Sequence, residues 1–150
     1  MLVQDIMTRS PKTVSPDTNL REVASMMCLY RIPALPVIDA DGKLVGNISE
    51  MDLLKNLLPT MEDIMDGEAV LELERMRSNY SSSMDQHVSD MMNNAPVSVT
   101  PDQHVLKATA KMTSHRFRRI PVTESDGKLV GVMSLGDVHK AIFHDHVSAD

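Results

Sequence analysis

Two Ser-x-x-Asp steps hold the side chains best suited to chemistry in this chain of 150 residues. Ser49 and Asp52 form the first step, Ser134 and Asp137 form the second, and each follows a Gly-x-x sequence. One interpretation is a capping box, in which a Ser and an acid three residues later satisfy the free N–H groups at the start of a helix. The other is a binding site, because a helix N-terminus attracts anions and a carboxylate can accept two hydrogen bonds from a ribose diol. The spacing of either step alone leaves both interpretations open.

The elements around the two steps are repeated as well. In the first copy, an Asp41-Gly42 turn and an apolar run at 44–48 precede Ser49, and apolar residues at helical spacing follow it. When residues 3–58 are placed on 88–143 at an offset of 85 without a gap, 20 of the 56 positions are identical. The chain is therefore a tandem duplication, and a matched pair of steps favours function over two coincidental caps.

Each copy is predicted to contain the elements β-α-β-β-α. A β-leaning trio ends at Val14, and Ser15-Pro16-Asp17 then has the features of a helix start, namely a hydroxyl N-cap, a Pro and an acid. Two strands and a second helix complete the copy. A single copy of about 55 residues buries too little surface to be stable by itself, so the two copies are expected to pack together. The predicted fold class is therefore α/β, of the α+β kind, with repeats at 1–58 and 88–150 packed as a pseudo-two-fold pair.

Residues 59–87 separate the repeats and carry most of the net charge. The whole chain has a net charge of -6, and this insert holds seven acids against Arg75 and Arg77. Its apolar residues predict one or two helices, broken near Gly67, and then a flexible linker at Ser81–Ser83. The acidic face is interpreted as solvated, with a docking surface for a partner as the alternative.

The composition excludes several classes of function. Neither the insert nor the remainder offers the basic field that nucleic acid requires, and four aromatic residues make no stacking wall. No apolar run approaches the ~20 residues of a membrane span, so membrane insertion is not expected. The single Cys28 is compatible with a reducing cytoplasm. No paired catalytic constellation is present, and His144-Asp145-His146 lacks a third ligand nearby, so neither an enzyme nor a metal site is expected.

The repeat resembles the cystathionine β-synthase (CBS) domain, and the pair resembles a Bateman module. The matching pieces recur in the same order in both copies and cover about 112 of the 150 residues. They are Asp5-Ile6-Met7 with Pro11, Pro-Val at Pro36 and Pro121, Asp-Gly-Lys-Leu-Val-Gly at 41–46 and 126–131, and the two Gly-x-x-Ser-x-x-Asp steps.

The resemblance implies two clefts between the repeats that bind adenosine-containing ligands. In such modules the Asp of the step holds the ribose hydroxyls, and the Ser lies near the ribose or phosphate. This assigns Ser49 and Asp52 to one cleft and Ser134 and Asp137 to the other. Further residues would flank the adenine, namely Thr13, Pro36, Ile48, Ser98, Pro121 and Met133.

Family members often carry a basic pair shortly before the Pro of the middle strand, where it reaches the phosphates. The second repeat has Arg118 and Arg119 there, whereas the first has Pro33 and Ala34. Family geometry pairs Asp52 with the two Arg, whose guanidinium groups suit phosphate oxygens. A solvated helix end is the alternative for this pair. The Asp137 cleft is expected to be empty, weaker or selective for less phosphate.

The expected function is a non-enzymatic, cytoplasmic regulatory module that requires no cofactor. It would bind AMP, ADP or ATP as a regulatory ligand and signal to an unidentified partner protein by a change of conformation. Family habit adds a homodimer, which would bury Met26, Met27 and Leu54 if these point outward. The alternatives are a structural homodimerisation module with empty clefts and a sensor of S-adenosylmethionine or another adenosyl compound.

Overall fold

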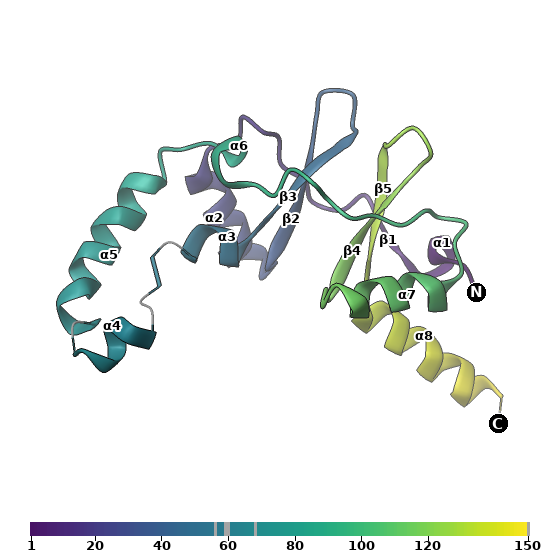
Figure 1. Ribbon diagram of the computed structural model, residues 1–150. Helices are drawn as coiled ribbons and strands as arrows, with labels where there is room; N and C mark the ends of the chain where they lie inside the picture. Colours follow the sequence, from purple (N-terminus) through teal and green to yellow (C-terminus); the bar gives the residue numbers. More distant parts are fainter. Residues whose placement is uncertain (56, 59–60, 68, 150) are drawn as a thin grey trace. The chain divides into compact units, whose positions relative to one another are not determined.

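The computed structural model describes residues 1–55, 57–58, 61–67 and 69–149, without the side chains at 63 and 69–72. Helices and strands succeed one another in a mixed α+β fold, as the repeat pattern predicts (Figure 1). The chain divides into two compact units, and each of them contains residues from both repeats. Unit 1 comprises Met1–Lys12, Ile38–Val45 and Ala95–Asp150, and unit 2 comprises Thr13–Val37 and Gly46–Asn94.

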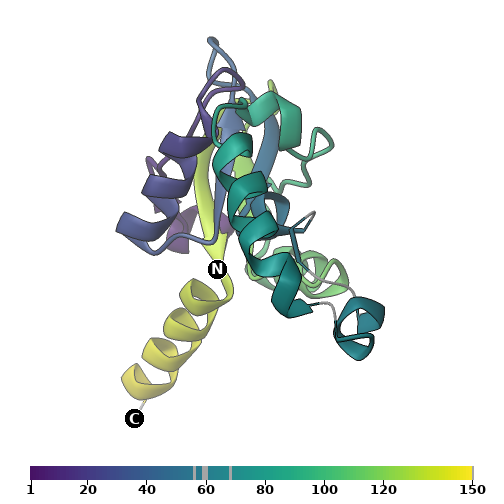
Figure 2. The ribbon, with the colours of Figure 1, turned by 90° about the vertical axis from the view of Figure 1, so that its left-hand side faces the viewer.

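Unit 1 is built on an antiparallel three-stranded sheet with the order β1-β5-β4. Helix α8 contacts β5, α1 and α7, and its second half extends beyond the rest of the unit (Figures 1 and 2). Apolar side chains such as Met112, Ile120 and Met133 are fully buried in the core of this unit. The elements are α1 (Val3–Ile6), β1 (Thr8–Arg9), α7 (Val105–Ser114), β4 (Arg119–Thr123), β5 (Leu129–Ser134) and α8 (Leu135–Ser148).

Unit 2 holds most of the two-stranded sheet β2-β3, the helix α2 that precedes it and the helices that follow it. Leu20, Leu35 and Ile48 are its largest fully buried side chains. The bounds are α2 (Leu20–Tyr30), β2 (Ala34–Ile38), β3 (Leu44–Ser49), α3 (Glu50–Leu54), α4 (Met61–Met65), α5 (Ala69–Ser83) and α6 (Val88–Met91).

The leading segment of each repeat packs in the unit formed mainly by the other repeat. Strand β1, from the start of the first repeat, pairs with Gly131 and Val132 of β5. At the positions 85 residues away, Asn93 of the second repeat forms a β-bridge with Asn47. The two compact units therefore differ from the two sequence repeats by an exchange of these short segments, and also because Ile38–Val45 of the first repeat belongs to unit 1.

Two glycines make this exchange possible. A Cβ on Gly131 would lie 2.8 Å from Met7 Sδ and 2.8 Å from the Thr8 carbonyl oxygen. A Cβ on Gly46 would lie 2.7 Å from Met92 Sδ and 2.9 Å from the Asn93 carbonyl oxygen. Both approaches are closer than a real Cβ tolerates, so each leading segment requires a Gly in the strand that it crosses.

The predicted helix start at Ser15 is wrong, and so is the equivalent start at Thr100-Pro101-Asp102 in the second copy. Residues 15–18 form a turn, in which the Ser15 backbone N–H donates to Thr18 Oγ1 at 3.0 Å. Helix α2 instead begins at Leu20, and its N-cap Asn19 accepts from the Arg21 N–H at 2.8 Å. The second copy behaves alike, with His104 as the N-cap of α7. A hydroxyl residue, a Pro and an Asp suit the first positions of a turn as well as those of a helix.

The insert forms two helices that Gly67 separates, as the sequence predicts. Gly67 has a φ of +75°, and α4 ends before it while α5 begins after it. The predicted linker at Ser81–Ser83 is wrong, because these residues form the last turn of α5 and Ser83 Oγ donates to the Tyr80 carbonyl at 2.8 Å. Residues 59, 60 and 68 of the insert lie outside the part that the structure describes.

Candidate functional site

The first Ser-x-x-Asp step forms the N-terminal cap of α3. Ser49 is the N-cap residue, and its Oγ accepts from the Asp52 N–H at 3.2 Å. In return, Asp52 Oδ2 accepts from the Ser49 N–H at 2.8 Å and from Ser49 Oγ at 3.0 Å. Lys55 Nζ lies 3.8 Å from the other carboxylate oxygen, Oδ1. The Asp52 side chain is 17% exposed, so the cap holds it at the surface in a fixed orientation.

The second step forms the N-terminal cap of α8 in the same way. Ser134 Oγ accepts from the Asp137 N–H at 3.0 Å, and Asp137 Oδ2 accepts from the Ser134 N–H at 2.8 Å. Among the residues that the structure describes, these bonds use only one oxygen of Asp137. Since a carboxylate has about four acceptor positions on its two oxygens, capping leaves capacity for further donors at both steps. The capping box is thus confirmed at both steps.

Arg118 and Arg119 lie beside the second cap. Arg119 is directly opposite Ser134 in the β4–β5 ladder, and the Leu135 N–H donates to the Arg118 carbonyl at 2.9 Å. In the first repeat, the Glu50 N–H makes the equivalent bond to the Pro33 carbonyl, also at 2.9 Å. The backbone is therefore alike at both helix starts, but only the start of α8 has two exposed arginines next to it.

The remaining candidate residues differ in their accessibility. Ile48 and Met133 are fully buried, so their side chains shape the adjacent strands from within and would contact an adenine only if the core opened. Pro36 is buried as well, whereas Pro121 and Thr13 are half-buried. None of these burial values requires a ligand, because core packing accounts for each of them.

A polar group that the sequence comparison missed surrounds Ser98. Thr123 Oγ1 donates to Ser98 Oγ at 3.0 Å, and Lys111 Nζ donates to the Ser98 carbonyl at 2.8 Å. The first repeat has Met26 and Ile38 at the positions of Lys111 and Thr123. Alignment of the two copies could have indicated this polar group, because at both positions the first copy has an apolar residue where the second has a polar one. Ser98 is consequently held by hydrogen bonds from Lys111 and Thr123, whereas the residues equivalent to these two in the first copy, which contains Thr13, have apolar side chains.

The structure divides the candidate residues between its units. Unit 2 holds Thr13, Pro36, Ile48, Ser49 and Asp52. Unit 1 holds the others, namely Ser98, Arg118, Arg119, Pro121, Met133, Ser134 and Asp137. Each Ser-Asp cap is complete within its own unit, while the pairing of Asp52 with the two arginines stays a prediction.

Comparison with known proteins agrees with this repeated architecture. The family model described as "CBS domain" matches the chain twice, at residues 3–59 and 88–144. The chain belongs to the CBS domain family. It contains a tandem CBS pair, the arrangement called a Bateman module. Among the described residues, no helix is long and apolar enough to cross a membrane.

Several similar proteins come from distant organisms. The uncharacterized protein MJ1426 of Methanocaldococcus jannaschii is 29% identical, with 95% of this chain and 91% of that protein covered. The CBS domain-containing protein YhcV of Bacillus subtilis is 30% identical, with 91% of this chain and 81% of that protein covered. The chain spans only 61% of the chloroplastic protein CBSX1 of Arabidopsis thaliana, to which it is 30% identical.

The solved structures include a CBS pair with a nucleotide. The crystal structure of CBSX2 in complex with AMP matches with a TM-score of 0.75 and 28% identity, and it covers 97% of this chain and 98% of that chain. The structure of CBSX2 from Arabidopsis thaliana matches with a TM-score of 0.80 at the same identity. The fold of the present chain is thus that of a CBS pair.

Proposed function

We propose that this CBS pair is a non-enzymatic regulatory module that binds an adenine nucleotide, AMP, ADP or ATP, between its repeats. The observation that carries the proposal is the pair of Ser-Asp caps, each of which fixes a surface carboxylate and keeps acceptor capacity for a ribose diol. A similar CBS pair, CBSX2, has been crystallised with AMP, which supports an adenosine ligand for this chain.

Asp52 and Asp137 hold the ribose hydroxyls in this proposal. The reciprocal bonds with Ser49 and Ser134 orient each carboxylate before a ligand arrives, which lowers the entropy cost of binding. Arg118 and Arg119 bind the phosphates of the nucleotide whose ribose lies on Asp52. Their backbone is fixed to the start of α8, while their side chains are exposed. A nucleotide on Asp137 has no such pair from the first repeat, since Pro33 and Ala34 occupy those positions.

Binding regulates a partner protein if the nucleotide stabilises one arrangement of the module over another. The module acts as a homodimer in this proposal, and exposed apolar side chains on several helices support that role. Leu54, which is 40% exposed, and the half-exposed Met26 are available for such contacts. Met27 is not available, because it is 2% exposed and belongs to the buried face of α2. The free Cys28 suits a reducing compartment such as the cytoplasm.

Thermal unfolding in the presence of separate ligands tests the proposed function. AMP, ADP, ATP, adenosine, S-adenosylmethionine and GMP would each be added at rising concentration. A ligand at 100 times its dissociation constant stabilises the folded state by about 2.7 kcal/mol and raises Tm by several degrees. We expect this rise with at least one adenine nucleotide. If no ligand raises Tm, the module is a structural dimerisation unit, and if only S-adenosylmethionine does, the phosphate role of the arginines is wrong.

A further inference from the structure

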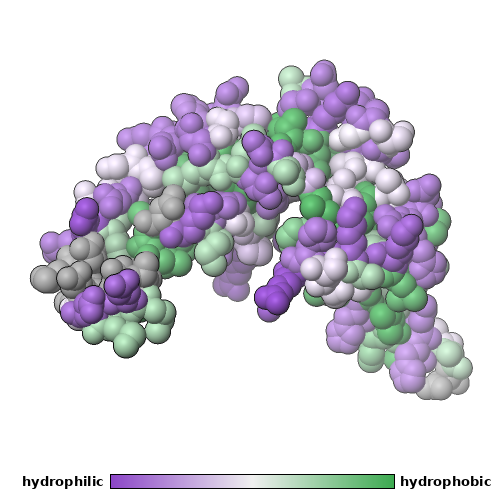
Figure 3. All heavy atoms as spheres, viewed as in Figure 1, coloured by the Kyte–Doolittle hydropathy of each residue, from purple (hydrophilic) through white to green (hydrophobic). Residues whose placement is uncertain are grey.

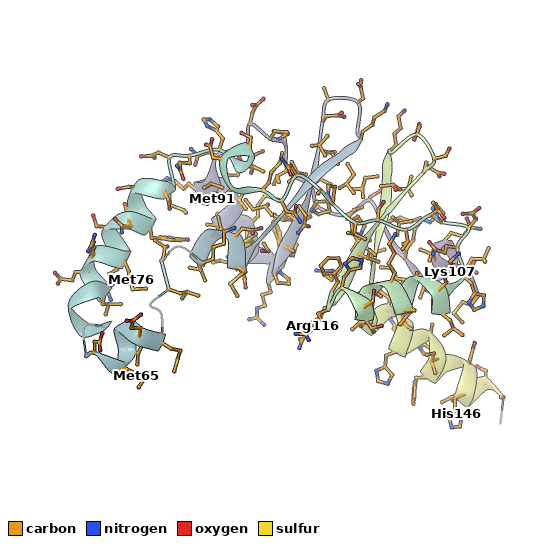
Figure 4. The ribbon with its side chains drawn as sticks, viewed as in Figure 1. Met65, Met76, Met91, Lys107, Arg116 and His146 are labelled. Atoms are coloured by element: carbon orange, nitrogen blue, oxygen red, sulfur yellow. The ribbon has the colours of Figure 1, made fainter. Side chains whose placement is uncertain are left out.

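The insert between the repeats carries an apolar surface that the described part of unit 2 leaves uncovered. Met61, Ile64 and Met65 of α4 are 72%, 49% and 81% exposed, and they share one side of the helix because they lie three and four positions apart. Leu58, which precedes the helix, is 49% exposed. Figure 3 shows pale green spheres gathered over α4, and Figure 4 shows Met65 at the end of this helix. We call these four side chains the insert surface.

Helix α4 has no buried side among the side chains that the structure describes. All of those side chains are exposed, whereas α3, which also has five residues, buries Leu53. A helix of this length is far shorter than the about 12 residues that an isolated helix needs to be even marginally stable, so packing of an apolar side normally stabilises it. An occupant that covers Met61 and Met65 would supply this packing to α4.

The charge around the insert surface is negative. Residues 56–74 contain six acids and no Lys or Arg. Glu62 and Asp66 are both exposed, and the Asp66 N–H donates to the Glu62 carbonyl at 3.0 Å, which places the two acids on adjacent turns beside Met65. Nucleic acid, an anionic membrane or an acidic protein would be repelled from this surface, whereas a basic segment would be attracted to it.

We propose that the insert surface binds a basic amphipathic helix of a partner protein. The apolar side of that helix packs on Met61, Ile64 and Met65, and the flexible methionine side chains adapt to its shape. Lys or Arg residues along the edge of the partner helix pair with Glu62 and Asp66. A basic segment without an apolar side would leave the methionines uncovered, and an apolar helix without basic residues would leave the carboxylates unpaired. The occupant therefore needs both features.

This contact supplies the kind of partner that the proposed regulatory function requires, and it rests on that function for its biological role. The contact itself uses residues of the insert alone and requires no nucleotide. Peptide binding without AMP therefore tests the contact, while the rise of Tm with AMP tests the nucleotide site. A wild-type protein that binds the peptide but not AMP would retain the docking surface and lose the nucleotide function.

Fluorescence anisotropy with three labelled synthetic peptides tests the chemistry of the occupant. The first peptide is an amphipathic helix of Leu and Lys, the second has Glu in place of every Lys, and the third has the composition of the first in an order that forms no apolar side. We expect the wild type to bind the first peptide at least about tenfold more tightly than either of the others, because only the first offers both the charge and the apolar side. Equal affinity for the first and third peptides, or no binding of the first, would overturn the proposal.

Substitution of the methionines locates the apolar part of the contact. Met61→Ser with Met65→Ser should weaken binding of the Leu–Lys peptide at least about tenfold, because two apolar side chains no longer pack on it. Leu29→Ser with Leu106→Ser is the matched control, since these side chains are 71% and 64% exposed on α2 and α7. This control should bind the peptide as the wild type does. Equal losses in the two double variants would contradict the assignment to the insert.

Neutralisation of the two acids tests the charged part of the contact. Glu62→Gln with Asp66→Asn should weaken peptide binding about two- to tenfold and reduce its dependence on salt. Glu22→Gln with Asp102→Asn removes two exposed acids elsewhere and should change neither quantity. Circular dichroism checks the fold of every variant, and the acid pair carries the test if the methionine pair is misfolded. Unchanged peptide affinity in the folded insert variants would overturn the proposal, as would light scattering in which the insert joins two copies of this chain while the wild type binds no peptide.

Discussion

Arg119 lies directly opposite Ser134 in the β4–β5 ladder, and this pairing fixes the basic pair to the start of α8. The neighbouring Arg118 carbonyl accepts from the first N–H of that helix at 2.9 Å. The arginines are thus held next to the cap of Asp137, although family geometry assigns their guanidinium groups to the nucleotide on Asp52. Binding measurements can therefore decide whether the arginines share a nucleotide with Asp52 or with Asp137.

Arg118→Ala with Arg119→Ala should weaken AMP binding and spare adenosine. A charged hydrogen bond contributes about 1.5–3 kcal/mol, so we expect a loss of at least about tenfold for AMP in isothermal titration calorimetry. Adenosine lacks the phosphate and should bind both proteins alike. An equal loss for the two ligands would refute the phosphate role.

A double-mutant cycle should identify the aspartate that shares a nucleotide with the arginines. The effect of removing both arginines on AMP affinity is measured in the wild type, in Asp52→Asn and in Asp137→Asn. We expect coupling with Asp52 and additive effects with Asp137. Coupling with Asp137 alone would assign the arginines to the site on their own unit.

Gly131→Ala should destabilise the protein by about 1–3 kcal/mol, because its Cβ would lie 2.8 Å from both Met7 Sδ and the Thr8 carbonyl oxygen. Gly46→Ala should behave alike in the other unit. Gly136→Ala is the control: its Cβ would meet only Ser134 Oγ at 3.5 Å, and Ala favours a helix by up to about 1 kcal/mol. Urea unfolding measures all three, and a neutral Gly131→Ala would show that the leading segment does not pack as described.

Fragments 1–80 and 81–150 should each fail to fold alone and should fold when mixed. Val3 and Val88 would lose their packing partners in these fragments, because each side chain is completely buried in the unit formed mainly by the other repeat. Circular dichroism during thermal unfolding checks this. Cooperative unfolding of either fragment alone would mean that a repeat is stable without the exchanged segment.

Much of the fold follows from local sequence patterns. The hairpin turns at Gly42 and Gly127 adopt φ values of +80° and +90°, as Asp-Gly turns require, and the strands beside them lie within one or two residues of the prediction. The helix break at Gly67 follows from the same kind of signal. Such features depend on a few adjacent residues, so one sequence is enough to predict them.

Other features depend on contacts between distant residues. The exchange of leading segments joins Met7 to Gly131 across more than a hundred residues, and no local periodicity encodes that contact. The mistaken helix start at Ser15 has a different cause, since Ser-Pro-Asp fits a turn as well as a cap and Asn19 forms the real cap. At the candidate site, the repeated Ser-x-x-Asp steps predict the caps, but the polar contacts of Ser98 appear only once the elements are packed.

Calorimetric titration of AMP into the wild type and into Asp52→Asn/Asp137→Asn tests the central claim most directly. Asn keeps an oxygen that can accept from the N-cap N–H, so the variant should remain folded. It loses the carboxylate charge and acceptor capacity for the ribose diol, so the account predicts AMP binding by the wild type and at least about tenfold weaker binding by the variant. Equal AMP affinity in the two proteins, or no binding by the folded wild type, would contradict it.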